Sequence, residues 1–409
     1  MEDKKIAKGL SVAAIILITI SAVLLSLNKL NGRLYGTEAT FYGIPFVAAF
    51  AIPLLAILIL LTRYLKSTDT MDDMIAAVAV RYAIFGWFFV FAIRLGNDLL
   101  NMFCYDFYQE HYTTIYLLMN SFNVCVIGTL VLGFLLRDIP AVKIEKKKMK
   151  AGQLFLIIMM MYGLTHIGSL MGTPIDTAIS LFSSTDPAEA SKSISLMFGS
   201  DLFIRILCIG ILPAIFEELL FRKFLIDRTL RYGEFISCAM SGIMFGLWHG
   251  NFQQFFFTFF IGVLASFVYI RTGKIIYTMI MHASLNLVTS TVTMQMLQEI
   301  MKKAGFDMTT GKVADMSAVE AEQMLRSILP LLCFMLAWLL ILVSFQIAGF
   351  IILIVKRKMF KLVAMEGEPA RKVILRKLTH NVSMWVFFAF ALLLFFTAYM
   401  PGILAKLFG

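Results

Sequence analysis

Long apolar runs alternate with short polar connectors along almost the whole chain. Each run approaches the roughly 20 residues that an α-helix needs to cross a bilayer. Arg81 and Arg94 fall inside the third run, and the run at 234–250 is the shortest. The pattern predicts an all-α, polytopic integral membrane helix bundle with about 10–11 spans. The expected spans are 10–28, 42–62, 75–97, 112–136, 152–171, 201–226, 234–250, 253–270, 274–297, 329–355 and 382–408.

Composition supports a membrane protein. The 409 residues are 60% hydrophobic and 15% charged, with a mean hydropathy of +0.84, whereas soluble proteins average about 25% charged residues. The basic stretch Met1–Lys8 precedes an apolar run that lacks an A-x-A-like exit, so we expect a span rather than a signal peptide. The five cysteines are scattered, without a C-x-x-C motif, and indicate neither a metal site nor a disulfide framework.

The net charge of +10 is concentrated in two connectors, 137–150 and 356–377. The connector 98–111 has no Lys or Arg, and 172–201 is acidic. Basic connectors of membrane proteins face the cytoplasm, so the amino terminus is expected inside and, with eleven spans, the carboxyl terminus outside. The charge therefore indicates topology and contact with anionic lipid rather than nucleic acid.

The polar stretch 298–328 is expected to be extracellular, as a linker or a lid. Within it, Ser317 and Glu320 have capping-box spacing and predict the start of a short surface helix. The stretch 178–200 is similar in kind.

Four charged residues interrupt the apolar run ILPAIFEELLFRKFLI: Glu217, Glu218, Arg222 and Lys223. Charges at membrane depth are costly unless they are paired or line a wet cavity. Glu218 and Arg222 are four residues apart, so they lie on one helix face and can pair. Glu217 is rotated from Glu218 by roughly 100° on an α-helix, so it is the acid that needs another explanation.

Two further spans bring polar groups to similar depth. We counted from the expected cytoplasmic end of each span, at about 1.5 Å per residue. Glu217 then lies roughly 15 Å deep and His249 roughly 22 Å. His282 and Asn286, one helical turn apart, lie roughly 12 and 18 Å deep. Close helix approach is favoured by glycines at four-residue spacing on the His249 span, at 242, 246 and 250.

These groups are suited to hydrolysis. A carboxylate can take a proton from water while a histidine orients it, and a His–Asn pair can stabilise an oxyanion. A structural ion pair and packing histidines would also explain the residues. The motifs G-x-S-x-G and H-E-x-x-H are absent, and no Ser or Cys nucleophile is indicated.

The segments EELLFR, FGLWH and HASLN resemble the motifs EExxxR, FxxxH and HxxxN of the CAAX protease and bacteriocin-processing family of intramembrane proteases, which includes type II CAAX prenyl endopeptidases. The resemblance covers roughly residues 200–297. It implies an all-helical membrane bundle around a conical cavity. It implies that Glu217 activates water, assisted by His249, and that His282 and Asn286 stabilise the oxyanion. Supporting roles fall to Glu218, Arg222 and Phe245.

Metal is a separate question, since the family is often labelled as metalloproteases. Zinc would need about three protein ligands, and Glu217, His249 and His282 could supply them. Glu217 could then hardly act as the base, so we expect a glutamate-activated water with no obligatory cofactor. Alternative functions are a non-proteolytic scaffold or bacteriocin-immunity protein, and a proton-coupled transporter, which the absence of duplicated halves disfavours.

The chain is thus expected to have three parts: N-terminal helices in 1–200, a catalytic core in 201–297, and an extracellular linker with C-terminal helices in 298–409. The expected partners are a peptide or membrane-protein substrate and the lipid bilayer. The methionine content and the absence of an organelle signal favour a bacterial plasma membrane.

Overall fold

The computed structural model describes residues 2–35, 44–66, 68–183, 200–307, 312–313, 316–364 and 367–408. The first half contains α1 (Glu2–Tyr35), α2 (Ile44–Tyr64), α3 (Met71–Phe103), α4 (Tyr105–Glu110), α5 (Tyr112–Ser121), η2 (Phe122–Gly128), α6 (Thr129–Leu135) and α7 (Ala151–Leu181). The middle contains α9 (Leu202–Arg205), η3 (Ile206–Ile211), α10 (Leu212–Glu218), η4 (Leu219–Phe224), α11 (Leu225–Thr229), η5 (Leu230–Tyr232), α12 (Glu234–Trp248) and α13 (Phe252–Thr272). The remainder contains α14 (Ile275–Asn286), η6 (Leu287–Thr293), α15 (Met294–Lys303), β1 (Phe306–Asp307), β2 (Lys312–Val313), α16 (Ala318–Val355), η7 (Arg357–Met359), α17 (Arg371–His380) and α18 (Val382–Phe408).

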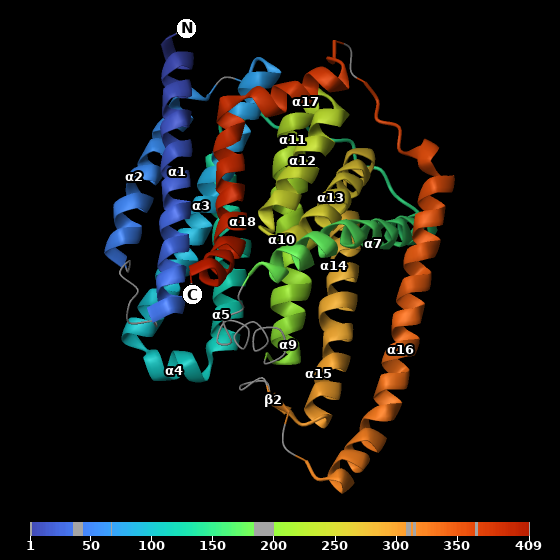
Figure 1. Ribbon diagram of the computed structural model, residues 1–409. Helices are drawn as coiled ribbons and strands as arrows, with labels where there is room; N and C mark the ends of the chain where they lie inside the picture. The colour runs from blue at the N-terminus through green and yellow to red at the C-terminus, as the bar shows by residue number, and fades with distance from the viewer. Residues whose placement is uncertain are drawn as a thin grey trace.

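The predicted all-α membrane bundle is confirmed (Figure 1). Eight helices in the described part are long and apolar enough to cross a membrane, and two shorter apolar helices, Ala51–Tyr64 and Glu234–Trp248, correspond to two more expected spans. The eleventh expected span, 201–226, lies in an unbroken helical segment that runs from α9 to η5. Apart from helices, the described residues contain one short antiparallel pair of strands, β1 with β2.

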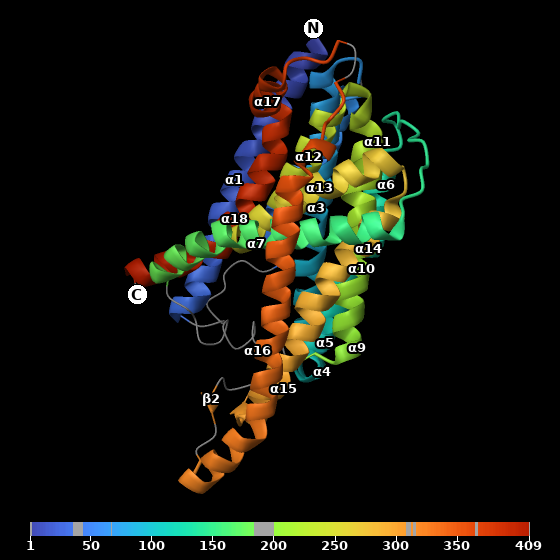
Figure 2. The same ribbon diagram turned by 90° about the vertical axis from the view of Figure 1, so that its right-hand side faces the viewer.

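Helix α7 lies crosswise to α16 and to most of the bundle. The expected span at 152–171 falls in this helix, which is long and apolar enough to cross a bilayer. Yet it runs across the bundle in two perpendicular views (Figures 1 and 2). Small residues let it pack closely on two helices: Gly163 lies against the backbone of Phe350 in α16, and Gly168 against Phe257 in α13. Helix α7 therefore crosses α16 but runs beside α13, where Gly172, one turn after Gly168, lies against Phe252.

Helix α16 begins earlier than the apolar pattern predicts. Ser317 and Glu320 do form a capping box, with Glu320 N donating to Ser317 Oγ at 3.3 Å and Ser317 N donating to Glu320 at 2.8 Å. The helix that they open has 38 residues and continues through the expected span 329–355. The expected short surface helix is therefore wrong, because the helix continues through Pro330 into the apolar run. In the other polar stretch, residues 184–199 lie outside the described part.

The buried arginine of the third span is satisfied by neighbouring oxygens. Arg81 is 1% exposed, and its Nη2 forms an ion pair with Asp138 at 2.6 Å. Its Nε and Nη1 donate to the carbonyls of Leu135 and Ala77. A paired guanidinium is tolerated inside a span. The side chain of Arg94 lies outside the described part.

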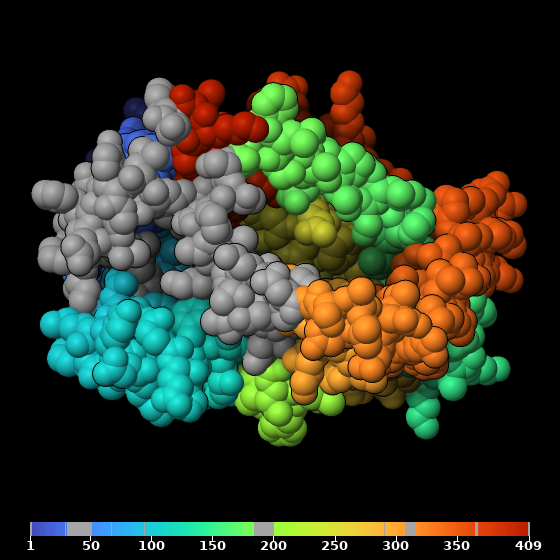
Figure 3. All heavy atoms as spheres, turned by 60° about the horizontal axis from the view of Figure 1, so that its bottom comes forward, coloured from blue at the N-terminus to red at the C-terminus, as the bar shows by residue number. Residues whose placement is uncertain are grey.

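The two basic connectors lie at the same end of the molecule as the amino terminus (Figure 1). In the first, Val142 N donates to Asp227 O and Lys147 N donates to Thr272 O. The end of α15 and the start of α16 lie at the opposite end. From that side, the molecule is hollowed between α7 and α15, and yellow atoms of the α12–α13 hairpin lie at the bottom of the hollow (Figure 3).

Candidate active site

The helical segment that carries both glutamates alternates between α- and π-helical turns. The α-helical α10 ends at Glu218 and is flanked by the π-helices η3 and η4. A third π-helix, η6, follows α14 directly after Asn286. The π-helix is rare and is found frequently at functional sites. Each change of helical type alters which backbone carbonyls receive a hydrogen bond from within the helix.

Pro213 explains one of these irregularities. It has no N–H, so it cannot donate to Ile209 O four residues back or to Cys208 O five residues back. Side chains of other helices bond to these two carbonyls instead. Asn286 Nδ2 donates to Ile209 O at 3.0 Å, and Ser121 Oγ donates to Cys208 O at 3.1 Å. The proline thus connects the helix of the glutamates to the helix of Asn286.

The next π-helix, η4, receives similar bonds. Ser241 Oγ of α12 donates to Phe221 O at 2.9 Å, and the Tyr82 hydroxyl of α3 donates to Leu220 O. Sequence reasoning missed Tyr82, Ser121 and Ser241. Only Pro213 could have signalled that side-chain donors are needed, and it does not say which helices provide them.

Glu218 and Arg222 form the buried ion pair that their spacing predicts. Their side chains are 0% exposed, and Arg222 Nε lies 3.1 Å from Glu218 Oε2. The guanidinium also lies 4.3 Å from the ring centroid of Phe245, where the negative face of the ring attracts a cation. Phe245 therefore forms one wall of the ion pair.

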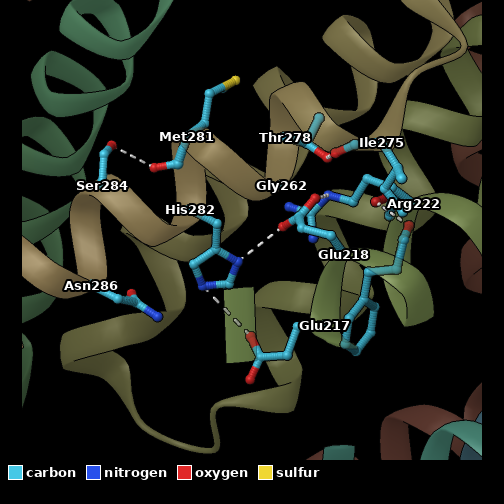
Figure 4. Close-up of polar contacts among 12 residues, drawn as sticks. Glu217, Glu218, Arg222, Gly262, Ile275, Thr278, Met281, His282, Ser284 and Asn286 are labelled. Atoms are coloured by element: carbon cyan, nitrogen blue, oxygen red, sulfur yellow. Dashed lines mark hydrogen bonds and ion pairs between the residues drawn. The ribbon is translucent and has the colours of Figure 1, made fainter. Parts of the chain in front are cut away.

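His282 lies between the two glutamates (Figure 4). Its Nδ1 is 3.0 Å from Glu218 Oε1, and its Nε2 is 3.8 Å from Glu217 Oε2. The first distance is a hydrogen bond, whereas the second is longer than a direct one. Because a carboxylate only accepts, the bond to Glu218 assigns a hydrogen to Nδ1. Figure 4 shows Asn286 one turn further along the same helix.

Glu217 differs from Glu218 in its access to solvent. Its side chain is 14% exposed, against 0% for Glu218. Among the described residues its nearest ion-pairing group is His282, and Arg222 is held by Glu218. Glu217 is therefore the acid of the pair that can meet a water molecule.

His249 and His282 both lie against the Phe245 ring. The His249 ring centroid is 5.0 Å from that of Phe245, and the His282 centroid is 5.9 Å away. The His249 Nδ1 donates to Phe245 O at 2.8 Å, which leaves Nε2 as the other polar atom of the ring. Phe245 thus contacts both imidazoles, each with its ring plane nearly perpendicular to the phenyl plane.

The predicted site residues accordingly fall into two groups. Glu217, Glu218, Arg222 and His282 form one connected cluster. His249 joins it through Phe245, and within the described part it forms no ion pair with Glu217. The catalytic roles expected for these residues stay predictions.

A metal ion does not fit the arrangement of these side chains. Within the described residues, no group of three His, Cys, Asp or Glu side chains is placed to hold a metal ion. His282 Nδ1 and His249 Nδ1 already have protein partners. Among the described residues, Glu217, His249 and His282 are therefore not grouped as three ligands of one ion.

One comparison with known proteins gives a match. Residues 199–288 match the model of the family described as type II CAAX prenyl endopeptidase Rce1-like. No curated protein matches the chain, and no solved structure matches it. The matched residues include all three motifs, from Glu217 to Asn286, so the family resemblance predicted from those motifs is confirmed. Residues 199–288 of this membrane protein are therefore similar to the Rce1-like type II CAAX prenyl endopeptidases, a family of intramembrane CAAX-type proteases.

Proposed function

We propose that the protein is an intramembrane endopeptidase that hydrolyses peptide bonds with a water molecule activated by Glu217. One observation carries the proposal: His282 lies between a fully buried Glu218, paired with Arg222, and a Glu217 that keeps 14% exposure. An ion pair that served only structure would need one acid. The second acid, near an imidazole and open to water, has the arrangement of a general base.

In the first step, Glu217 removes a proton from water while the water oxygen attacks the scissile carbonyl carbon. The Nε2 atom of His249 accepts the other water proton in a hydrogen bond and so orients the attack. The tautomer of His249 suits this role, because its Nδ1 hydrogen is given to Phe245 O.

The tetrahedral oxyanion is then stabilised by donors from α14. An imidazolium form of His282 would keep one hydrogen on Glu218 and direct the other, on Nε2, toward the side of Glu217, where the water attacks. The Asn286 amide nitrogen carries two hydrogens and would contribute one donor. Removing one such donor typically slows an acyl-transfer enzyme by about 10²–10³-fold.

Collapse of the intermediate completes the reaction. The carbon–nitrogen bond breaks as Glu217 returns its proton to the leaving amine, which gives a carboxylic acid and an amine. The acid then passes its proton to the amine, so the final products are a carboxylate and an ammonium group. Glu218 and Arg222 stay charged throughout and hold His282 in place. No step requires a metal ion.

The substrate is proposed to be a peptide or a membrane-protein segment. The family description names prenylated CAAX proteins, and a substrate of this class is the first to test. Unprenylated peptides, including bacteriocin precursors, form the second group.

The test is cleavage of a peptide library by the purified full chain in nanodiscs, followed by mass spectrometry. We expect cleavage by the wild-type protein and none by the Glu217→Gln protein. Equal cleavage by both proteins would refute the mechanism. Rescue of the biological role by Glu217→Ala would favour a scaffold or immunity protein, and proton-coupled uptake into vesicles would favour a transporter.

A further inference from the structure

A mostly apolar cavity lies outside the candidate active site, beside the carboxyl-terminal end of α16. Its volume is about 520 Å³. Its walls come from α12, α13, α16, the connector 357–362 and α17. Ala239 and Val263 line the bundle side, Leu353 lines the α16 side, and Arg357 is the one charged residue in the lining. We call this cavity the α16 wedge.

The crosswise helix α7 explains why the α16 wedge exists. Helix α16 packs mainly on α7 and α15. Almost none of its apolar segment is buried against the rest of the molecule. Gly163 of α7 brings the two helices into contact at Phe350. Next to this contact, Leu164 forms part of the wedge lining. Residues of α16, α12 and α13 line the cavity together, so the α16 wedge lies between these three helices.

The basic connector after α16 covers the end of the α16 wedge. Phe360 packs on Phe267 of α13, with ring centroids 5.1 Å apart. Val363 N donates to Glu234 at 2.7 Å, and Glu234 also forms an ion pair with Arg271. These contacts hold the connector against the start of α12 and the end of α13. The connector is therefore held in place as one wall of the α16 wedge.

The size and lining of the α16 wedge fit one lipid chain. At roughly 30 Å³ for a group the size of a water molecule, its volume corresponds to about 17 such groups. A single long acyl chain has a similar number of carbons. The α16 wedge and the active site lie on different sides of α12. Ala239 of this helix lines the wedge, whereas Phe245, six residues further along, faces the active site.

Arg357 supplies the charge that an anionic headgroup needs. It is exposed, and within the described residues its guanidinium donates only to Ile354 O, in its own turn, and forms no ion pair with a carboxylate. It lies at the end of the molecule that carries the basic connectors. Anionic lipid headgroups are attracted to such positions.

We propose that the α16 wedge binds one anionic phospholipid, with an acyl chain along α12 and α13 and the phosphate at Arg357. The lipid fills the space that α7 keeps between α16 and the bundle. This site is independent of the proposed peptidase activity.

Native mass spectrometry of the full chain in detergent tests the proposal, with phosphatidylglycerol and phosphatidylcholine as probes. We expect one tightly retained phosphatidylglycerol per chain. Arg357→Gln should weaken its binding about fivefold, since one basic residue near the surface contributes about 1 kcal/mol. Ala239→Phe should reduce binding of both lipids by filling the α16 wedge, and Leu353→Phe provides a second filling variant from the opposite wall.

Arg376→Gln is the matched control, because Arg376 is exposed on α17 at the same end but does not line the α16 wedge. It should bind phosphatidylglycerol as the wild type does. Unchanged binding in Arg357→Gln and in both filling variants would overturn the proposal. Displacement of phosphatidylglycerol by inorganic phosphate alone would also overturn it, because the acyl chain would then contribute nothing.

Discussion

Pro213 and Asn286 form a pair at the scale of single residues. The proline removes the donor that Ile209 O would have in a regular helix, and Asn286 replaces it at 3.0 Å. Asn286 therefore has a structural task as well as the proposed catalytic one. The two tasks can be separated by restoring the missing backbone donor.

We expect Asn286→Ala to lower the free energy of unfolding by about 1–3 kcal/mol, the cost of an unsatisfied buried acceptor. In a Pro213→Ala background the backbone N–H can bond to Ile209 O, so the same change should cost less than half as much. Cleavage should stay lost in the double variant. Melting curves and peptide assays of all four proteins measure this, and restored cleavage in the double variant would leave Asn286 with a purely structural role.

Substitutions of the two adjacent glutamates should have different effects on stability and on cleavage. Glu218→Gln and Arg222→Gln each leave one fully buried charge without its partner, and breaking a buried pair costs about 3–5 kcal/mol. Glu217→Gln removes a partly exposed carboxylate, so its melting temperature should stay near that of the wild type while cleavage is lost. Thermal melting in nanodiscs compares the three variants. A Glu217→Gln protein that melts as early as Glu218→Gln would contradict the separate roles.

Chelation tests the prediction that no metal is obligatory. Because the described side chains offer no three-ligand group, cleavage should persist after prolonged dialysis against a chelator. The measurement is the peptide cleavage rate before and after dialysis, with metal content followed by mass spectrometry. Loss of cleavage that added zinc restores would instead assign Glu217, His249 and His282 as ligands.

Sequence spacing predicted the Glu218–Arg222 pair. It did not predict that His282 would bridge both glutamates, or that His249 would be held at Phe245 O. Spacing along one helix fixes neighbours on that helix, whereas contacts between helices depend on rotation. Each π-helical turn changes that rotation, and the pattern of apolar residues carries no signal for it.

At the scale of elements, the apolar runs predicted where helices occur but not how they lie. Length and hydropathy are the same for a helix that crosses a bilayer and for α7, which lies across the bundle. Three glycines of α7 determine how it lies, because Gly163, Gly168 and Gly172 each mark a close approach to another helix. Their partners could not be known from one sequence.

Glycine substitutions test this packing of α7. A Cβ at Gly168 would overlap the backbone of Phe257, which cannot move aside as a side chain can. Gly168→Ala should therefore lower the melting temperature by several degrees, as overpacking costs about 1–3 kcal/mol. Gly152→Ala is the matched control in the same helix, because a Cβ there meets no atom within 4 Å. It should leave the melting temperature unchanged or raise it slightly, since Ala favours helices.

At the scale of the whole molecule, the positions of the connectors predict which residues share a side of the membrane. The basic connector that contains Lys147 lies at the same end as the amino terminus, and α15, whose last residue is Lys303, reaches the opposite end (Figure 1). Single cysteines at 147 and 303, in a chain without other reactive cysteines, should label from opposite sides with an impermeant reagent. We expect 303 to react from outside and 147 only after permeabilisation. Reaction of both from outside would contradict the orientation inferred from the basic connectors.

The hydroxyl groups that complete η3 and η4 come from a distant part of the chain. Ser121 and Tyr82 lie outside residues 199–288, yet they bond to Cys208 O and Leu220 O inside that segment. The segment that defines the family is therefore not a portable module. Expressed alone, it would leave these carbonyls facing lipid, and a chimera with foreign amino-terminal helices would need a hydroxyl at both positions to rebuild the site.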